Sequence, residues 1–582
     1  MKYSLLFFIL CFPVFVFSQK YDYNWLNGLV RPGLSSNFLI NFNKISPQIY
    51  VVNTDLDLAT TYCSISDYWG NSENLLYTNG CSLKFRENVM SDFINLDDYW
   101  CGYDTLMNNP QGIFGVPIEG TSKILLFSYS TIWPATPTVL GYNCQVKKFI
   151  YHTFDLGWNN GEGALVSKDQ VLLEGCFQRA VACRHSNGRD WWILLADNLQ
   201  NRFYRWLLTP NGLEGPVEQE IENPTIGNDV QWGIINPAWT EFSANGSKLL
   251  INQTERVTVV YDFDRCTGLL SNLVSLPRNS LYNFSAVFSP NGNYLYTVDD
   301  GGKILLQYDL LSPDIIGSKD TVAVWDGFTY ATIKTTIFTY MQHGPDGKIY
   351  IWAGDTRYMH VIEFPNRRGE ACQVRQRAIN LPAEVFAANL YYPNYRLGPI
   401  DGSACDSLGI DNHPMAVFRY AVEDTLSPYS VTFTDASSYE PTAWHWQFGD
   451  GAVSQDTNPV HTYPGPGTYH VCMVVSNVYS ADTLCRDVIV GTVDVHDLPV
   501  LPLVAVRPNP FSDYLQVSLP AQIPGISPWF GLYDLYGRPV YSGFLREFDS
   551  MIPVSRLRPG MYRWHIWWGS KLEQSGKVMK VE

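Results

Sequence analysis

The side chains that could perform acid–base chemistry are dispersed along the 582 residues of this sequence. Of the ten histidines, His152, His185, His343 and His360 fall within the first 400 residues. No GxSxG, HExxH or Walker sequence surrounds any of them, so no nucleophile, zinc protease or phosphate site is spelled out. Each isolated histidine is therefore interpreted as a structural or surface residue. An enzymatic site would require the fold to bring acids and histidines together.

Two pairs of acidic residues follow strand-like segments and have the ligand chemistry of a calcium site. These are Asp262 with Asp264, and Asp299 with Asp300. Aspartate after a strand is more commonly a turn cap, and no DxDxDG loop occurs. The cysteines show no zinc spacing. We therefore predict no metal ligands, no cofactor and no catalytic residue.

Aromatic side chains offer a third kind of chemistry, because rings can stack on sugars. Trp191, Trp192 and Trp206 are the most concentrated example. The favoured interpretation is that they fill the space between packed sheets, since aromatics dominate cores. Adjacent Trp191 and Trp192 must point to opposite faces of a strand, which would leave one of them less buried.

The composition indicates that the elements which position these side chains are strands. Charged residues make up 16% and aromatics 14%, with 44 Gly and 35 Pro. Few charges, many aromatics and frequent turn formers favour short strands. The net charge of −16 and the lack of Lys/Arg clusters argue against a nucleic-acid partner. We predict an all-β fold.

A loose repeat runs from about residue 19 to residue 398. FSANGSKLL, FSPNGNYLY and QHGPDGKIY each place a turn before a strand, with glycines at Gly246, Gly292 and Gly347. Gly188, in HSNGRDWWILL, marks a diverged copy. An acidic residue follows in three copies, as in VVYDFD, LQYDL and VIEFP. Periods of roughly 45 to 55 residues are typical of propeller blades, so this segment predicts a β-propeller of about seven blades.

Several stretches of this segment resemble a family of large secreted propellers. They are SISDYWGNSENLLYTNGC, CRHSNGRDWWILL, YDFDRCTGLLSN and the closing YYPNYRLG of residues 391–398. The resemblance implies an architecture and no particular reaction.

After a Gly-, Asp- and Ser-rich linker at 399–412, residues 413–491 form a second segment of alternating strands. It resembles the PKD domain, an immunoglobulin-like β-sandwich. The resemblance rests on PTAWHWQFGDG and NPVHTYPGPGTYHVCMVVSN. Its aromatic and turn positions are Trp444, Trp446, Phe448, Gly449, Asp450 and Gly451.

The same segment contains two cysteines on consecutive strands. A turn centred between Val478 and Tyr479 places Cys472 opposite Cys485. We therefore predict a cross-strand disulfide between them.

A second linker at 492–503 leads to residues 504–582, which resemble the type IX secretion C-terminal sorting domain. VRPNPFSDYLQVSL, GLYDLYGRPVYSG and VSRLRPGMYRWHIWW occur in the order of that domain. The motif positions are Pro508, Asn509, Pro510, Gly537, Pro559, Gly560 and Tyr562. The resemblance implies a small β-sandwich that is recognised by the type IX translocon.

Residues 1–18 have the layout of a removable signal peptide: one cation, an apolar run and small residues before the cleavage point. A lipoprotein anchor at Cys11 is disfavoured because Leu10 stands where a small residue is needed. No later stretch is long and apolar enough for a membrane span. We expect a secreted or surface-displayed protein of a Gram-negative bacterium.

Three functions remain open. The leading hypothesis is an extracellular binding or adhesion protein whose propeller binds a glycan or a surface protein. The second is a hydrolase or lyase of an extracellular polymer, which converging acids and histidines in the propeller channel would favour. The third is a structural component of a surface layer or motility apparatus.

Overall fold

The structure is a computed structural model, and its chain divides into two compact units, residues 1–490 and 491–582. It describes residues 20–490 and 505–581 except for 32–33, 44–46, 53, 55–57, 59–62, 68–70, 80–81, 87, 91–112, 132–146, 198–199, 223–238, 253–256, 278–284, 331–333, 386–390, 425–426, 508–510, 519–528, 535–537, 546–548 and 569–570. The predicted signal peptide and the linker at 492–503 lie outside the described residues. No helix of the described residues is long and apolar enough to cross a membrane.

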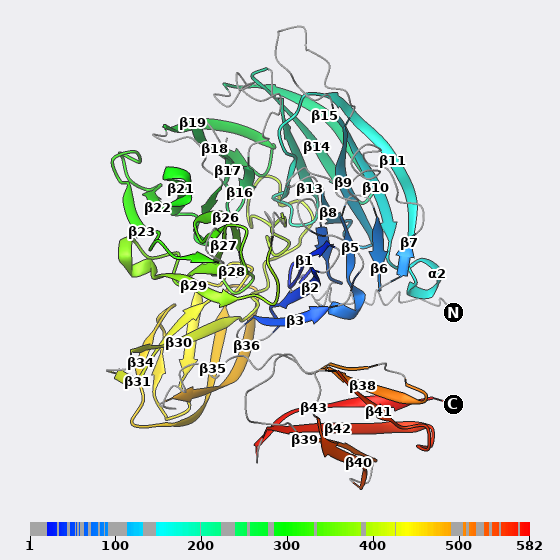
Figure 1. The fold of residues 1–582 in the computed structure, drawn as a ribbon. Coiled ribbons are helices and arrows are strands. Elements are labelled where there is room, and N and C mark those ends of the chain that lie inside the picture. The colour runs from blue at the N-terminus through cyan, green and yellow to red at the C-terminus, as the bar shows by residue number, and fades with distance from the viewer. Residues whose placement is uncertain are drawn as a thin grey trace, which may run out of the picture. The chain divides into compact units, whose positions relative to one another are not determined.

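Within the described residues, seven antiparallel sheets of three or four strands follow one another from residue 24 to residue 380, and Figure 1 shows them in chain order. The strands of the first three sheets are β1 (Asn24–Arg31), β2 (Leu34–Asn41) and β3 (Gln48–Val52); β4 (Cys63–Ile65), β5 (Leu76–Thr78), β6 (Leu83–Phe85) and β7 (Asn88–Met90); β8 (Ile113–Pro117), β9 (Lys123–Thr131), β10 (Lys147–Asp155) and β11 (Ala164–Gly175).

The next four sheets are β12 (Val181–Arg184), β13 (Trp191–Ala196), β14 (Arg202–Thr209) and β15 (Gly212–Glu220); β16 (Trp239–Phe242), β17 (Lys248–Asn252), β18 (Val257–Asp264) and β19 (Leu269–Pro277); β20 (Ala286–Phe288), β21 (Tyr294–Asp299), β22 (Ile304–Asp309) and β23 (Asp320–Val324); β26 (Phe338–His343), β27 (Ile349–Ala353), β28 (Tyr358–Ile362) and β29 (Val374–Asn380). Shorter elements are β24 (Thr329–Tyr330), β25 (Lys334–Thr335), α2 (Trp158–Gly161) and the 3₁₀ turns η1 (Ser72–Asn74), η2 (Asp300–Gly302) and η3 (Gly369–Cys372).

Packing between the sheets closes them into a ring. The first strands of several consecutive sheets contact each other, as β12 contacts β16 and β16 contacts β20. One buried cluster joins the first sheet to the last, because Trp25 and Phe42 pack edge-on against Tyr350 with ring centroids 5.6 Å apart in each pair. Sheets that each meander outward from an inner strand and close head to tail form a β-propeller. The prediction of a propeller of about seven blades is confirmed.

The repeated glycine turns join the first strand of a blade to the second. Gly246 N–H donates to Ser243 O at 2.8 Å, and Gly292 N–H makes the same bond to Ser289 O. The φ angle of Gly246 is +69°, and a Cβ there would lie 2.8 Å from Leu397 Cδ2. A positive φ and a close neighbour both favour glycine at this position.

The acidic residue of the repeat lies at or near the end of the third strand and, in two blades, pairs with a lysine at the start of the second strand or directly before it. Asp262 Oδ1 lies 2.6 Å from Lys248 Nζ, and Glu363 Oε2 lies 2.7 Å from Lys348 Nζ. The repeated turn and the repeated acidic residue are therefore connected by an ion pair between neighbouring strands. Such cross-strand pairs stabilise antiparallel strands.

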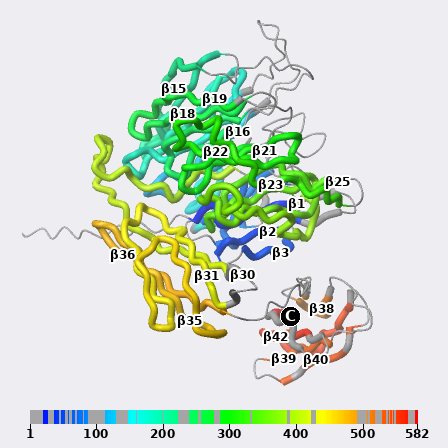
Figure 2. The backbone as a smooth tube through the Cα atoms, turned by 90° about the vertical axis from the view of Figure 1, so that its left-hand side faces the viewer, coloured from blue at the N-terminus to red at the C-terminus, as the bar shows by residue number. Residues whose placement is uncertain are grey.

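Residues 418–490 form a sandwich of two sheets, β30-β31-β34 and β33-β32-β35-β36, and Figure 2 shows β30, β31, β35 and β36 together. The strands are β30 (Phe418–Asp424), β31 (Ser427–Asp435), β32 (Ala443–Gln447), β33 (Val453–Ser454), β34 (Val460–Thr462), β35 (Gly467–Ser476) and β36 (Ala481–Val490). Trp446 and Phe448 are buried between the sheets, and Trp444 packs against them from a partly buried position.

The turn after Trp446 and Phe448 forms as expected. Phe448 N–H donates to Ala452 O at 3.1 Å, which closes the hairpin around Asp450 and Gly451. Gly449 and Gly451 have φ angles of +84° and +96°.

The second unit is a sandwich of sheets β37-β38-β41 and β40-β39-β42-β43. Its strands are β37 (Ala505–Arg507), β38 (Tyr514–Ser518), β39 (Trp529–Tyr533), β40 (Pro539–Phe544), β41 (Asp549–Pro553), β42 (Gly560–Trp568) and β43 (Lys571–Lys580). Phe530, Leu532 and Ile566 belong to its buried core. The all-β fold class, with a propeller followed by two sandwiches, is confirmed.

Disulfides occur in both parts of the first unit. Cys472 lies opposite Cys485 in the β35–β36 register, and the two are joined by a disulfide. A second disulfide, Cys266–Cys405, attaches the 399–412 segment to the blade of β16–β19. The linker is held further by Asn412, whose side chain donates to Pro399 O at 3.0 Å.

Candidate functional site

The segment at residues 391–398 crosses the inner ends of the blades. It hydrogen-bonds to residues from five of them, counted by the sheets above. The bonds are Ala182 N–H to Tyr391 Oη (3.1 Å), Ser64 Oγ with Tyr392 Oη (2.7 Å), Tyr392 Oη to Asn24 O (3.4 Å), Asn394 Nδ2 to Ala244 O (2.6 Å) and Tyr395 Oη to Gly115 O (2.8 Å). We call residues 391–398 the closing segment.

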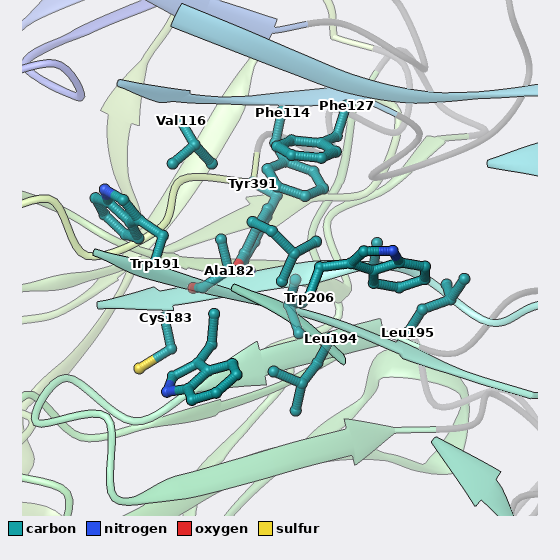
Figure 3. Close-up of a cluster of buried hydrophobic side chains, with 14 of the residues drawn as sticks. Phe114, Val116, Phe127, Ala182, Cys183, Trp191, Leu194, Leu195, Trp206 and Tyr391 are labelled. Atoms are coloured by element: carbon teal, nitrogen blue, oxygen red, sulfur yellow. The ribbon is translucent and has the colours of Figure 1, made fainter. Parts of the chain in front are cut away.

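Tyr391 is fully enclosed by this arrangement. Figure 3 shows its ring beside Phe114 and above Ala182. The Phe114 and Tyr391 rings meet edge-on with centroids 5.5 Å apart. The closing segment therefore links the blades, because its side chains take the place of water as hydrogen-bond partners of polar groups on and near the inner strands.

A cavity of about 750 Å³ lies between the closing segment, the ends of the inner strands and the PKD-like sandwich. Its rim is formed by the repeated turns of the blades that begin with β16, β20 and β26, including Asn245, Asn291 and Gly347. Arg419 of β30 and the loops 434–441 and 457–458 form the opposite wall. The volume lies within the range of binding sites for small molecules.

Glu241 and His343 face each other in this cavity. Glu241 comes from β16 and His343 from β26, and Glu241 Oε1 lies 3.3 Å from His343 Nε2. The indole Nε1 of Trp239 donates to Glu241 Oε2 at 3.2 Å. His343 was one of the histidines considered in the sequence, whereas Glu241 was not singled out. The signal that marks it is its place directly before the repeated FSANG turn.

Burial keeps both groups neutral near neutral pH. Desolvation raises the pKa of Glu241 to about 8, opposed by the Trp239 hydrogen bond. Desolvation lowers the pKa of His343 to about 4. Although the two atoms are close enough for an ion pair, we assign the pair as neutral, because both side chains are desolvated. A protonated carboxyl group in a cavity can donate a hydrogen bond or a proton.

The other three propeller histidines are held by the backbone. His152 Nδ1 accepts from Asp169 N–H at 3.1 Å, and His360 Nδ1 accepts from Arg377 N–H at 3.1 Å. His185 Nδ1 accepts from Asn187 N–H at 3.0 Å. These histidines therefore have the structural role that the sequence suggested.

The carboxylates considered as calcium ligands are engaged in turns and an ion pair. Asp262 pairs with Lys248, and Asp264 accepts from Cys266 N–H and Thr267 Oγ1. Asp299 accepts from Asp300 N–H. One triad in the described residues places metal-ligating side chains together, His470, Cys472 and Cys485, but its two sulfurs form the disulfide.

The tryptophans considered for sugar stacking are buried. Trp191 and Trp206 are each 1% exposed and Trp192 is 8% exposed. Trp192 is the less buried of the adjacent pair, as the alternation predicts, but both rings are buried. The three rings belong to the largest buried cluster of the propeller.

The predicted motif residues of the second unit are only partly described. Pro508, Asn509, Pro510 and Gly537 lie outside the described residues. Tyr562 is buried on β42, and its hydroxyl donates to Arg558 O at 2.8 Å. Pro559 and Gly560 are exposed at the start of that strand, and the φ of Gly560 is +153°.

Comparison with known proteins places two of the three parts in families. Residues 413–492 match the PKD domain, and residues 505–581 match the secretion system C-terminal sorting domain. No curated protein sequence matches the chain.

Similar solved structures come from enzymes and from isolated domains. The PKD1 domain of the Vibrio cholerae metalloprotease PrtV is 29% identical, over 14% of this chain and 98% of that one, with a TM-score of 0.13. A putative 6-phosphogluconolactonase from Bacteroides fragilis is 11% identical, over 63% of this chain and 97% of that one, with a TM-score of 0.37. A Pseudomonas aeruginosa periplasmic gluconolactonase is 12% identical, over 63% of this chain and 97% of that one, with a TM-score of 0.35.

The molecule is therefore a multidomain β-propeller protein with a PKD domain and a type IX secretion sorting domain. The sorting domain implies handling by the type IX secretion system, and hence a secreted or cell-surface location. The PKD domain supports an extracellular role.

Proposed function

We propose that this protein is an extracellular binding protein whose ligand occupies the cavity between the propeller and the PKD domain. The observation that carries the proposal is that each domain contributes to the cavity wall a residue with a buried, unsatisfied polar atom. Gln342 Oε1 and Arg419 Nε are buried without a hydrogen-bond partner, and both residues line the cavity. Buried polar groups are normally paired, so such atoms are candidates for ligand contacts.

In this proposal the chain is divided by role. Residues 19–398 and 413–491 form the binding unit, and residues 399–412 connect them. Residues 492–503 are a linker, and residues 504–582 are the export address that follows a signal peptide at 1–18. The ligand would be an extracellular glycan or a segment of a surface protein.

A substitution that fills the cavity tests the proposal. Thr457 lines the cavity from a PKD loop, whereas Gln455 in the same loop is exposed and does not line it. The exported protein and its Thr457→Trp and Gln455→Trp variants are compared on arrays of extracellular glycans and surface peptides. We expect to find a ligand that binds to the native protein and to the Gln455→Trp variant. The Thr457→Trp variant should no longer bind it. Binding that survives in Thr457→Trp would place the ligand elsewhere.

The Glu241–His343 pair supports a second candidate function, acid-assisted cleavage of the bound ligand. Glu241 would act as the general acid, because its raised pKa keeps a proton available near neutral pH. Glu241→Gln separates the two functions, since the amide keeps the shape but has no acidic proton. Unchanged ligand binding with lost turnover would indicate an enzyme. A ligand that the native protein binds and never cleaves would indicate a binding protein.

A further inference from the structure

Two arginines from different domains flank one aromatic ring in the wall of the cavity. The guanidinium carbon of Arg367, in the loop after β28, lies 4.2 Å from the centroid of the Phe364 ring. The guanidinium carbon of Arg419, on β30 of the PKD domain, lies 5.2 Å from the same centroid. All three residues line the cavity. Burial lowers the pKa of Arg419 and repulsion from Arg367 adds to this, so the two charges act on each other at the interface between the domains.

Neither of these arginines has an ion-pair partner among the described residues, in contrast to two other arginines of the same cavity. Arg184 Nη1 lies 2.8 Å from Glu119 Oε1. Arg396 Nη2 lies 2.9 Å from Asp22 Oδ2. The cavity therefore contains two neutralised cations and two that are not neutralised by direct contact.

The nearest acidic groups are already engaged by other donors. Glu363 and Asp346 act on Arg419 through space. Glu363 is 2.7 Å from Lys348 Nζ and 3.1 Å from Arg375 Nη1. Asp346 Oδ2 accepts from the Tyr350 hydroxyl at 2.7 Å.

A buried guanidinium without a counter-ion is costly, and Arg419 is only 7% exposed. Its Nε makes no hydrogen bond within the described part of the chain. An anion bound by these guanidinium groups would relieve this and would be held by charge-assisted hydrogen bonds, which arginine forms with planar carboxylates. Phe364 contacts both groups through cation–π interactions.

The rest of the cavity is suited to hydroxyl groups. Amide and hydroxyl side chains line it, and Gln342 Oε1 lacks a donor. The protonated carboxyl of Glu241 and the aromatic Trp239 are also part of the wall. A ligand that satisfies these groups offers several hydroxyls in addition to its acidic group.

We propose that Arg367 of the propeller and Arg419 of the PKD domain bind the carboxylate of an acidic saccharide, so that the ligand of the cavity is a uronic-acid-containing glycan. This inference rests on the proposed binding function and names its ligand class. The ligand would bridge the two domains through one arginine from each.

The test uses the exported protein and isothermal titration calorimetry. The probes are trisaccharides of galacturonic, mannuronic and guluronic acid, each paired with its fully methyl-esterified form. The variants are Arg367→Gln, Arg419→Gln and, as a matched control, Arg368→Gln. Arg368 is exposed, pairs with Asp320 and does not line the cavity.

We expect at least one acidic trisaccharide to bind and its methyl ester to bind about 10- to 100-fold more weakly, as for the loss of a charged hydrogen bond. Arg367→Gln and Arg419→Gln should weaken binding by a similar factor, and Arg368→Gln should leave it unchanged. Because Arg419 is buried, the half-buried Arg367 provides an independent variant if Arg419→Gln does not fold.

Three results would overturn the inference: no acidic probe binds, acid and ester bind equally, or the acid binds Arg367→Gln as tightly as the native protein. The Thr457→Trp variant distinguishes failure of the proposed ligand class from failure of the proposed binding function. A neutral ligand that Thr457→Trp loses and the arginine variants retain would contradict the ligand class only. If no ligand depends on the cavity, both proposals fail.

Discussion

Glu241 Oε1 lies 3.3 Å from His343 Nε2, although the two side chains come from β16 and β26 in different blades. The blade that begins with β20 lies between them in the chain, and its first strand contacts both β16 and β26. The distance between the two side chains therefore depends on how these three blades stack against one another. The pair also places a protonated carboxyl group in the cavity between the propeller and the PKD domain.

Replacing Glu241 with Gln should change how stability depends on pH. The pKa of Glu241 is raised from 4.5 in the unfolded chain to about 8 by burial. The folded state therefore holds a proton that the unfolded state releases, and its stabilising effect is full below pH 4.5 and lost as pH rises to about 8. In Glu241→Gln this decline should be absent. From below pH 4.5 to above pH 8, the native protein should lose on the order of 3–5 kcal/mol of unfolding free energy that Glu241→Gln does not lose.

Urea unfolding at pH 5, 7 and 9 measures the effect. The exposed Glu73→Gln provides the control, which should follow the native curve. If Glu241→Gln loses stability between pH 5 and pH 9 as steeply as the native protein, the carboxyl group is not held in its protonated form.

Removing the Tyr391 hydroxyl should destabilise the propeller. That oxygen accepts from Ala182 N–H at 3.1 Å in a buried position. In Tyr391→Phe the amide is left without a partner, which typically costs about 1–3 kcal/mol. The midpoint of denaturant unfolding, followed by tryptophan fluorescence, provides the measurement. Tyr479→Phe, at an exposed turn of the PKD domain, should show no shift; equal midpoints for both variants would mean that the closing segment contributes little.

The Cys472–Cys485 disulfide should stabilise the β35–β36 hairpin of the PKD domain. It closes a short loop, with a sequence separation of 13. Loops of this size are stabilised by about 2–3 kcal/mol when crosslinked. The double variant Cys472→Ser/Cys485→Ser should lower the free energy of unfolding of the PKD domain by that amount, measured in a denaturant titration. Peptide mapping of the non-reduced protein tests the pairing directly, and free thiols at both positions would contradict it.

Deleting the sorting domain should prevent export. A chain that ends at residue 490 retains the propeller and the PKD domain as one compact unit but lacks the match at 505–581. We expect this chain to accumulate inside the cell envelope, while a reporter fused to residues 491–582 reaches the surface or the medium. Immunoblots of cell fractions distinguish the outcomes. If the truncated chain is exported at the native level, the sorting domain is not required for export.

Several features could be read from the sequence because they depend on local chemistry. Gly246 and Gly292 mark turns that need a positive φ, and their spacing gave the blade period. Alternation placed Trp446 in a sandwich core, and the turn near Val478 fixed which residue faces Cys472. In each case the structure depends on neighbours along the chain or across one hairpin, so spacing carries the information.

The candidate site could not be obtained in this way. His343 looked like any isolated histidine, and although Glu241 stands directly before a repeated turn, nothing in the sequence marks it or Arg367 as buried in a common site. Alternation correctly indicates that Trp191 and Trp192 differ in burial, but it does not show that both are buried. Burial and pairing depend on which distant segments meet, and a single sequence does not state that.

By itself, the sequence determined the all-β class, the propeller repeat, the two C-terminal sandwiches and the export address. Turn geometry, strand alternation and motif order are properties of short segments. Only the tertiary structure decided that the closing segment joins five blades, that Glu241 meets His343, and that Arg367 and Arg419 face one cavity. The physical reason is that each of these contacts is made when the ring closes and the PKD domain packs against it, where burial sets the charge and the available partners of each side chain.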